Sequence, residues 1–356
     1  MTVAITENQP TGAGTRTGAG TGPITVGLIH NVKRTKPTVG QDEDAEYDTP
    51  ETIDAITAAI EAEGHRVVKL EATAALLGIL PSAGIDVAFN IAEGQKGRGR
   101  ESWVPAVLDL LGVPYTGSDA TTMAITLDKG LAKRVVRSAG VATPEFLVID
   151  RVGAPLPAAL KYPVIVKPVA EGSSKGVTQN SVARDAAELR AVVDAVVGRY
   201  GQGAMVEGFL TGREFTVGVL GDGEVLAPME IAFAASAAEL PVYSFEHKQA
   251  FSDEVKYVCP AETTPALDAA LRAAAREAFV ALGCRDVARI DLRLDADGVV
   301  NFIECNPLPG LTPDWSDLCL IAKAEGMDYP ALVTAILRPA LARLRAARAP
   351  VEVEAP

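Results

Sequence analysis

The chain has 356 residues, a length that predicts about two or three domains. It carries 33 Lys and Arg against 46 Asp and Glu, a net charge of −13, and this balance argues against nucleic acid or an anionic membrane as a general partner. Hydrophobic residues make up 48% of the chain, which is enough for a packed core and argues against general disorder.

The cysteines and histidines indicate the redox state of the protein's compartment and whether a zinc site is expected. The four cysteines form no C-x-x-C pair, and the three histidines are far apart in the sequence. This pattern favours a reduced, cytoplasmic protein without a zinc site. No apolar run is long enough to cross a bilayer, and residues 1–10 lack the pattern of a secretory signal.

The first half of the chain alternates strands with helices, which predicts a parallel sheet with crossover helices. Residues 1–23 are rich in Thr and Gly and are expected to be a disordered tail. Strands are then expected at 24–29, 67–70 and 85–91, with a helix that starts at Asp48 or Thr49 and ends at Gly64. A long helix capped by Ser118 is expected to run to about Ala139.

The second half is expected to be richer in strands. A strand at 163–168 precedes a Gly- and Ser-containing loop and a helix at 184–197. The remaining expected elements are strands at 205–207, 214–220 and 225–227, a polar stretch at 243–257, a helix at 266–282, a hairpin, two helices and an Arg-rich frayed tail.

The hairpin gathers charged side chains. Asp297-Gly298 predicts a two-residue type I′ turn, which needs positive φ at both central positions. Such a turn gives the pairs Ala296–Val299, Leu292–Ile303, Ile290–Cys305, Asp291–Glu304 and Arg289–Asn306. Facing carboxylates repel unless a cation neutralises them, so Asp291, Glu304 and Asn306 predict a Mg²⁺ site, with Arg289 suited to an anionic intermediate. The alternative is a solvated hairpin face.

The loop after the strand at 163–168 suits phosphate. Gly172 and Gly176 permit a tight turn whose backbone N–H groups can cradle phosphate oxygens, although the Walker spacing is absent. By itself this loop could be an ordinary turn. Lys167 at the end of the strand strengthens the functional interpretation.

Eight short motifs occur in order along the chain: PYTGS at 114–118, LDK at 127–129, VIVKP at 164–168, EGSS at 171–174, GREFTV at 212–217, YVCPA at 257–261, RID at 289–291 and ECN at 304–306. This series resembles the D-alanine–D-alanine ligase family of the ATP-grasp superfamily, from about Ile24 to the last helices. The resemblance implies an ATP-grasp fold of α/β and α+β type with an N-terminal parallel α/β (pre-ATP-grasp) domain. The expected units are residues 24–117 for that domain, 118–207 for the central subdomain and 208–345 for the C-terminal subdomain, with tails at 1–23 and 346–356.

The resemblance also implies ATP and magnesium as cofactors, with manganese as an alternative to magnesium. Lys129 and Lys167 would hold the ATP phosphates, next to Glu171 and Ser174 of the loop. Glu207 would reach the adenine amino group. The backbone of Gly208, Phe209 and Leu210 would face the adenine, and Glu214 would bind the ribose. In the family's reaction, Lys248 of a mobile lid would reach the γ-phosphate, and Arg289 with the backbone of Gly310 would stabilise an oxyanion.

The substrate half departs from the family pattern. Glu46 is the nearest candidate to hold the first substrate's ammonium. Glu93 lies in a segment that usually carries His, and Gln249 stands where Tyr usually completes a network with Ser173. Ser316 is near the expected serine for the second substrate. Asp314 and Asp317 lie beside it, where a carboxylate would favour a cationic group, and the alternative for both is a helix cap facing solvent.

These features predict an ADP-forming carboxylate–amine ligase that acts through an acyl phosphate and has altered substrates. One alternative is a genuine D-alanine–D-alanine ligase of cell-wall synthesis, and the other is a non-catalytic nucleotide-binding module. The expected partners are small-molecule carboxylate and amine substrates, such as amino acids. A homodimer is compatible with the resemblance.

Overall fold

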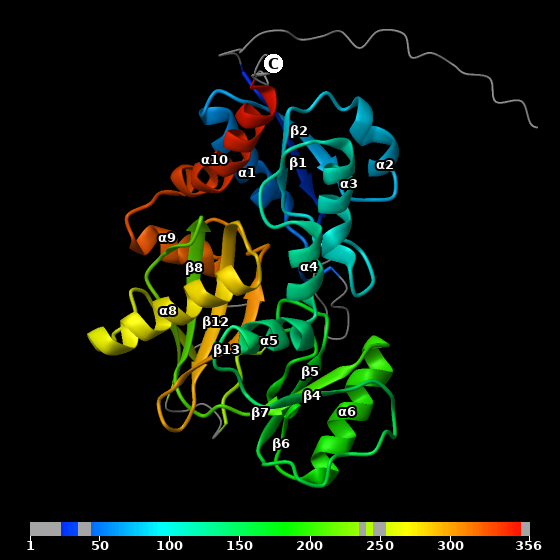
Figure 1. Cartoon of the computed structure of the whole chain (residues 1–356), viewed down its shortest axis with the longest axis vertical. Coiled ribbons are helices and arrows are strands. Elements are labelled where there is room, and N and C mark those ends of the chain that lie inside the picture. The colour runs from blue at the N-terminus through cyan, green and yellow to red at the C-terminus, as the bar shows by residue number, and fades with distance from the viewer. Residues whose placement is uncertain (1–22, 35–43, 235–239, 245–253, 350–356) are drawn as a thin grey trace, which may run out of the picture.

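The computed structural model describes residues 23–34, 44–234, 240–244 and 254–349. In Figure 1 the sheet within residues 25–90 lies at the top, the sheet within residues 214–306 lies in the middle, and the sheet within residues 146–208 lies at the bottom. Helices cover the three sheets. None of the helices in the described ranges combines the length and the apolar character that a membrane span needs.

The first sheet is parallel, with strand order β2-β1-β3, as predicted from the alternation of strands and helices. Thr49 caps the first helix by accepting a hydrogen bond from the Thr52 N–H, and Pro50 opens that helix. The elements are β1 (Thr25–His30), α1 (Pro50–Ala62), β2 (Arg66–Glu71), α2 (Leu76–Ile79), β3 (Val87–Asn90) and α3 (Trp103–Leu111), with 3₁₀ turns at Leu80–Ser82 and Arg100–Ser102.

The second sheet is antiparallel, with order β4-β7-β5-β6, and α6 packs on it. Asp185 caps α6 by accepting hydrogen bonds from two backbone N–H groups of its first turn. The elements are α4 (Ala120–Leu127), α5 (Lys129–Ser138), β4 (Phe146–Ile149), β5 (Val164–Pro168), β6 (Val182–Ala183), α6 (Ala186–Tyr200) and β7 (Ala204–Gly208), with a 3₁₀ turn at Gln179–Ser181.

The third sheet is also antiparallel, with order β11-β10-β8-β12-β13, and β9 pairs with β8. Its strands are β8 (Glu214–Gly221), β9 (Glu224–Val225), β10 (Met229–Phe233), β11 (Val255–Val258), β12 (Asp286–Leu294) and β13 (Val300–Asn306). The helices of this part are α8 (Pro265–Ala281), α9 (Asp317–Ala324) and α10 (Tyr329–Arg348).

The last helix packs against the first elements of the chain. Leu332 and Ile336 of α10 share one core with Ile56 of α1 and with Val26 of β1, and Figure 1 shows α10 beside α1. The expected frayed end is wrong in part, because α10 continues through Arg345 to Arg348.

The expected long helix from Ser118 to Ala139 is wrong. It is two helices, which meet at Asp128, whose backbone is extended (φ −82°, ψ 97°). Asp119 rather than Ser118 caps the first, and the Asp128 side chain caps the second by accepting from the Leu131 N–H. The break puts Lys129 in a first turn, where it is buried rather than solvated.

The hairpin between β12 and β13 differs from the prediction at its turn and at a bulge, and the two differences cancel in the register of the strands. Gly298 has a φ of 80°, whereas Asp297 has no positive φ, and the Asp295 N–H donates to the Val299 carbonyl, so the two-residue turn is wrong. A bulge after Asp291 pairs Leu292 with Phe302 instead of Ile303. Because the bulge cancels the shift at the turn, the predicted pairs Asp291–Glu304 and Arg289–Asn306 are confirmed.

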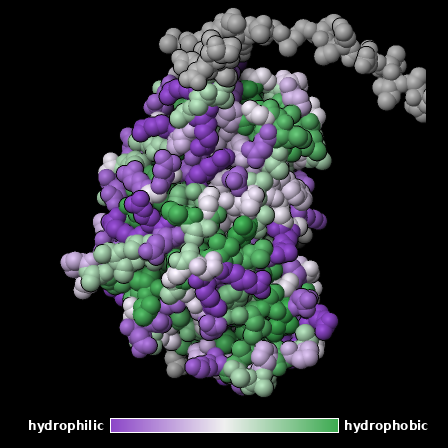
Figure 2. Space-filling view, in the orientation of Figure 1, coloured by the Kyte–Doolittle hydropathy of each residue, from purple (hydrophilic) through white to green (hydrophobic). Residues whose placement is uncertain are grey.

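Hydrophobic residues gather at the upper right of the face in Figure 2, over α2 and α3. Exposed hydrophobic side chains of α2 and α3 include Leu77, Ile79, Trp103 and Leu110. The rest of this face mixes hydrophilic and hydrophobic residues.

Candidate active site

Two adjoining cavities lie at the centre of the molecule. The large cavity, about 400 Å³, is lined by residues that follow β1 and β3 and by the loop from Asn306 to Asp317. The small cavity, about 90 Å³, lies between the second and third sheets. Four of the described residues line both cavities, namely Lys129, Glu171, Tyr243 and Glu304.

The small cavity gathers the residues predicted to bind the nucleotide. Nine of them line it together: Lys129, Lys167, Glu171, Ser174, Glu207, Gly208, Phe209, Leu210 and Glu214. Lys248 lies outside the described residues. The nine come from four separate stretches of sequence, which the first turn of α5, β5, β7 and the start of β8 bring to one place.

Two buried lysines hold Glu207. Lys167 Nζ lies 2.7 Å from one carboxylate oxygen and Lys133 Nζ lies 2.8 Å from the other. Burial lowers the pKa of Lys133 to about 8 despite this pairing, whereas the two ammonium groups outweigh burial and lower the pKa of Glu207. Sequence reasoning missed Lys133, although its spacing of four residues from Lys129 places it on the same helix face.

Arg293 is a second residue that sequence reasoning missed. Its guanidinium lies 4.8 Å from the ring centroid of Phe209 and forms a 3.1 Å ion pair with Glu214. Arg293 therefore orders two predicted nucleotide residues at once. Its place on the cavity face of β12 follows from the strand alternation that also presents Arg289 and Asp291.

Asp291, Glu304 and Asn306 form a donor set that suits magnesium. Asp291 faces Glu304 on the neighbouring strand, and the Thr216 hydroxyl donates to Asp291 at 2.6 Å. The Asn306 amide nitrogen donates to Asp291 at 3.3 Å, which leaves the Asn306 carbonyl oxygen available to a cation. Two carboxylates and an amide oxygen are hard ligands of the kind that Mg²⁺ takes, so the residues present fit this ion.

Arg289 lies between two carboxylates. Its Nε and Nη2 each lie 3.1 Å from an oxygen of Asp291, and its Nη1 lies 3.0 Å from Asp317 Oδ2. These two acids raise the pKa of the Arg289 guanidinium although burial opposes the charge. Arg289 lines the large cavity, beside the magnesium candidates Glu304 and Asn306.

Glu46 is buried and fully engaged. Arg100 Nη2 donates to both of its oxygens at 2.7 and 2.9 Å, the Gly172 N–H donates at 2.7 Å, and Lys175 Nζ lies at 3.3 Å. Burial raises the pKa of Glu46, but these positive groups outweigh it and lower the pKa overall. A Cβ at Gly172 would lie 2.2 Å from Glu46 Oε1, so a side chain there would displace the Glu46 carboxylate.

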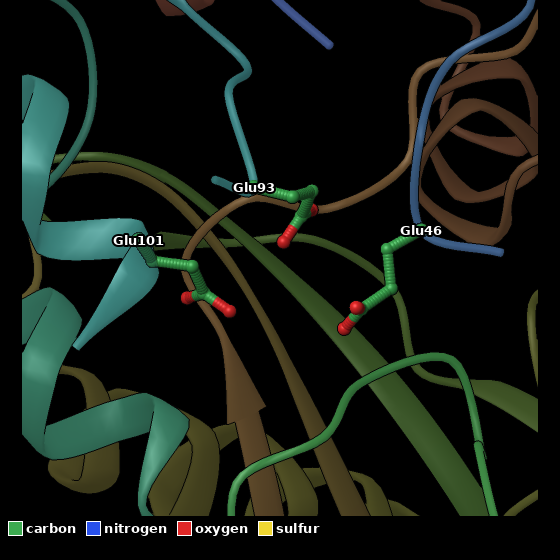
Figure 3. A group of neighbouring side chains, drawn as sticks. All are labelled: Glu46, Glu93 and Glu101. Carbon is green, nitrogen blue, oxygen red and sulfur yellow. The ribbon is translucent and has the colours of Figure 1, made fainter. Parts of the chain in front are cut away.

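Glu93 and Glu101 complete an acidic group with Glu46. Figure 3 shows the three carboxylates pointing toward one another, and oxygens of all three lie within 4.8 Å. Burial, with Glu101 and Glu46 nearby, raises the pKa of Glu93 well above its usual value, and burial raises that of Glu101 to about 7. Because Arg100 and Lys175 already neutralise Glu46, we assign no metal to this group.

The remaining predicted residues divide into two sets. Ser173, Gly310 and Ser316 line the large cavity, as do Glu46 and Glu93. Asp314 does not: its exposed carboxylate forms a 2.7 Å ion pair with Lys323, so its expected place in the substrate site is wrong. Asp317 lines the large cavity, and the alternative that it caps α9 is wrong because Ser316 is the N-cap. Gln249 lies outside the described residues.

Comparison with known proteins agrees with this geometry. A family model described as "D-ala D-ala ligase C-terminus" matches residues 135–338. A D-alanine–D-alanine ligase of Rhizobium meliloti is 36% identical over 259 residues, which cover 72% of this chain and 81% of that protein. An uncharacterized protein y4sG of Sinorhizobium fredii is 36% identical over 292 residues, which cover 80% and 85% of the two chains.

The fold has a counterpart of known structure. The crystal structure of a D-alanine–D-alanine ligase from Bacillus anthracis, complexed with ATP, matches with a TM-score of 0.72 at 23% identity and covers 92% of this chain and 100% of that chain. The predicted ATP-grasp fold is thereby confirmed.

The sheets and the adjoining cavities define an ATP-binding, ADP-forming ligase of the ATP-grasp superfamily. Within that superfamily, the chain belongs to the D-alanine–D-alanine ligase family, which confirms the resemblance noted from its motifs.

Proposed function

We propose that this enzyme joins the carboxylate of one amino acid to the amine of a second small molecule through an acyl phosphate, and that its substrates differ from a pair of D-alanines. The observation that carries the proposal is the junction of the two cavities. Lys129, Glu171, Tyr243 and Glu304 line both, so a phosphate group in the small cavity and a carboxylate in the large one meet at these residues.

ATP occupies the small cavity in this proposal. Lys129 and Lys167 bind its phosphates, the backbone of residues 208–210 faces the adenine, and Glu214, oriented by Arg293, binds the ribose. Asp291, Glu304 and Asn306 hold magnesium, which offsets the charge of the transferring phosphoryl group when bound. Lys248, which lies outside the described residues, is proposed to act on the γ-phosphate.

The chemistry needs two steps. A carboxylate oxygen attacks the γ-phosphorus, and the bond to the bridging oxygen breaks, which releases ADP. The amine nitrogen then attacks the acyl carbon, the carbon–oxygen bond breaks, and phosphate leaves with the electron pair and accepts the nitrogen's proton. Arg289 and the Gly310 backbone N–H stabilise the negative oxygen of the tetrahedral state.

Altered substrates are supported by the walls of the large cavity. The Glu46 carboxylate is already paired with Arg100, Lys175 and the Gly172 N–H. Two further acids, Glu93 and Glu101, lie beside it. Arg289 is paired with Asp317 on the other wall. The competing function is D-alanyl-D-alanine synthesis, which the 36% identity to ligases of that name favours.

Hydroxylamine trapping tests the acyl phosphate. The enzyme is incubated with ATP, Mg²⁺, hydroxylamine and a panel of D- and L-amino acids, and hydroxamate and ADP are quantified. We expect hydroxamate and ADP in equal amounts for at least one carboxylate. AMP in place of ADP, or no hydroxamate with any carboxylate, would contradict the proposed reaction.

A further inference from the structure

More acids than bases are found among the described residues that line the large cavity. Among the described residues that line it, seven are carboxylic acids and three are basic, Lys33, Lys129 and Arg289. Lys129 pairs with Glu304 at the junction of the cavities, and the loop from Asn306 to Asp317 contains no Lys or Arg. Arg289 is therefore the basic lining residue that lies against this loop.

Two carboxylates already pair with the Arg289 guanidinium. One guanidinium edge is held by Asp291, and Nη1 is held by Asp317, with side-chain exposures of 11% for Arg289 and 11% for Asp317. A substrate carboxylate that approached Nη1 would meet the Asp317 carboxylate at close range. Like charges repel strongly in such a desolvated place, so this geometry disfavours a carboxylate there.

Asp317 is fixed in its position. It is the first residue of α9, where the helix dipole stabilises an acid, and it is followed by the fully buried Leu318. The preceding turn is held by the Thr312 N–H, which donates to Ser316 Oγ at 3.0 Å. The Asp317 carboxylate therefore has a fixed position in the wall of the large cavity, next to Gly310 and Ser316.

We propose that Asp317 sets the specificity for the amine substrate: this wall accepts an amine that carries no free carboxylate beside it, such as an amino acid amide or a diamine, and disfavours a free α-amino acid. The inference rests on the proposed function, because it concerns the amine that attacks the acyl phosphate. The Asp317 carboxylate on this wall suits an uncharged or cationic substituent better than a second carboxylate.

The test compares matched amines. The carboxylate that gives most hydroxamate serves as donor, and kcat/KM is measured for alanine, alaninamide and ethylenediamine, with both enantiomers of the first two. We expect alaninamide to exceed alanine by about tenfold or more in the wild-type enzyme, and Asp317→Asn to reduce that ratio by about tenfold. Asp314→Asn, on the same loop but paired outside the cavity with Lys323, should leave the ratio unchanged.

Each result decides the inference. Equal or better use of alanine by the wild-type enzyme overturns it, and this comparison needs no variant to fold. A preference for alaninamide that survives unchanged in a folded Asp317→Asn variant also overturns it, because the preference would then have another source. Absence of hydroxamate with every donor removes the proposed function and this inference together, whereas hydroxamate formation with a preference for alanine removes only the inference.

Discussion

The amide nitrogen of Gly172 lies 2.7 Å from Glu46 Oε1 and donates a hydrogen bond to it, across 126 residues of sequence. This contact ties the glycine-rich loop to the segment before α1. We predict that Gly172→Ala lowers turnover about tenfold or more, because its Cβ would lie 2.2 Å from that oxygen and displace the Glu46 carboxylate from Arg100.

A glycine on α6 provides the control for this substitution. Nothing lies within 4 Å of a Cβ at Gly198, so Gly198→Ala should keep full activity and raise the free energy of unfolding by about 0.5–1 kcal/mol. Unchanged kinetics in Gly172→Ala would show that the contact with Glu46 has no role in turnover.

Magnesium should raise the affinity for ATP through its ligands on the β12–β13 hairpin. We predict that Asp291→Asn and Glu304→Gln each abolish most of the Mg²⁺-dependent gain in ATP affinity, while ATP binding in EDTA changes little, since the lysines remain. Titration calorimetry with and without Mg²⁺ measures both quantities. Asp297→Asn, at the exposed turn of the same hairpin, should behave as the wild type. A normal Mg²⁺ effect in both site variants would remove the assigned metal site.

The buried pair of Lys133 and Glu207 should be a point of weakness. We predict that Lys133→Met lowers the free energy of unfolding by about 3 kcal/mol, because it leaves one oxygen of the Glu207 carboxylate without its partner in a buried site. Urea denaturation measures the change. Lys161→Met, at an exposed position, should stay within about 0.5 kcal/mol of the wild type. Equal stability of the two variants would contradict the importance of the pair.

The contribution of Glu101 to stability should fall as the pH rises from about 4.5 to about 7. The pKa of Glu101 rises from 4.5 to about 7 on folding because its side chain is buried, so the folded state holds this proton more tightly. Its contribution is fully present below about pH 4.5 and is lost as the pH passes about 7, up to roughly 3 kcal/mol. Glu101→Gln should flatten this part of a stability–pH curve, measured by urea denaturation. A curve with the same slope in the variant would show that other groups cause it.

The nucleotide half could be predicted from sequence because its residues lie in short motifs at strand ends and loops. Lys167 and Glu207 occupy neighbouring strands of one sheet, where local patterns suffice to place them. Lys133 and Arg293 were missed because their importance depends on tertiary contacts with Glu207 and Phe209, which local sequence does not reveal.

The substrate half could be predicted only in part. Glu46, Glu93 and Ser316 reach the large cavity as expected, but Arg100, which organises Glu46, belongs to a 3₁₀ turn that no sequence pattern indicated. Asp314 and Asp317 are close in sequence and face opposite environments, since the backbone at Asp314 has a φ of 57° and turns its side chain toward Lys323. Such a turn is not encoded by hydrophobic periodicity.

The most direct test of the central claim is ADP release measured with ATP and Mg²⁺ against D- and L-amino acids and their carboxamides, singly and in pairs, with product masses recorded. We predict ADP in equal amount with an amide product, a donor–acceptor pair that outperforms D-alanine, and weak turnover with D-alanine alone. Efficient D-alanyl-D-alanine formation that saturates with D-alanine, with no better amine in the panel, would contradict the altered-substrate account.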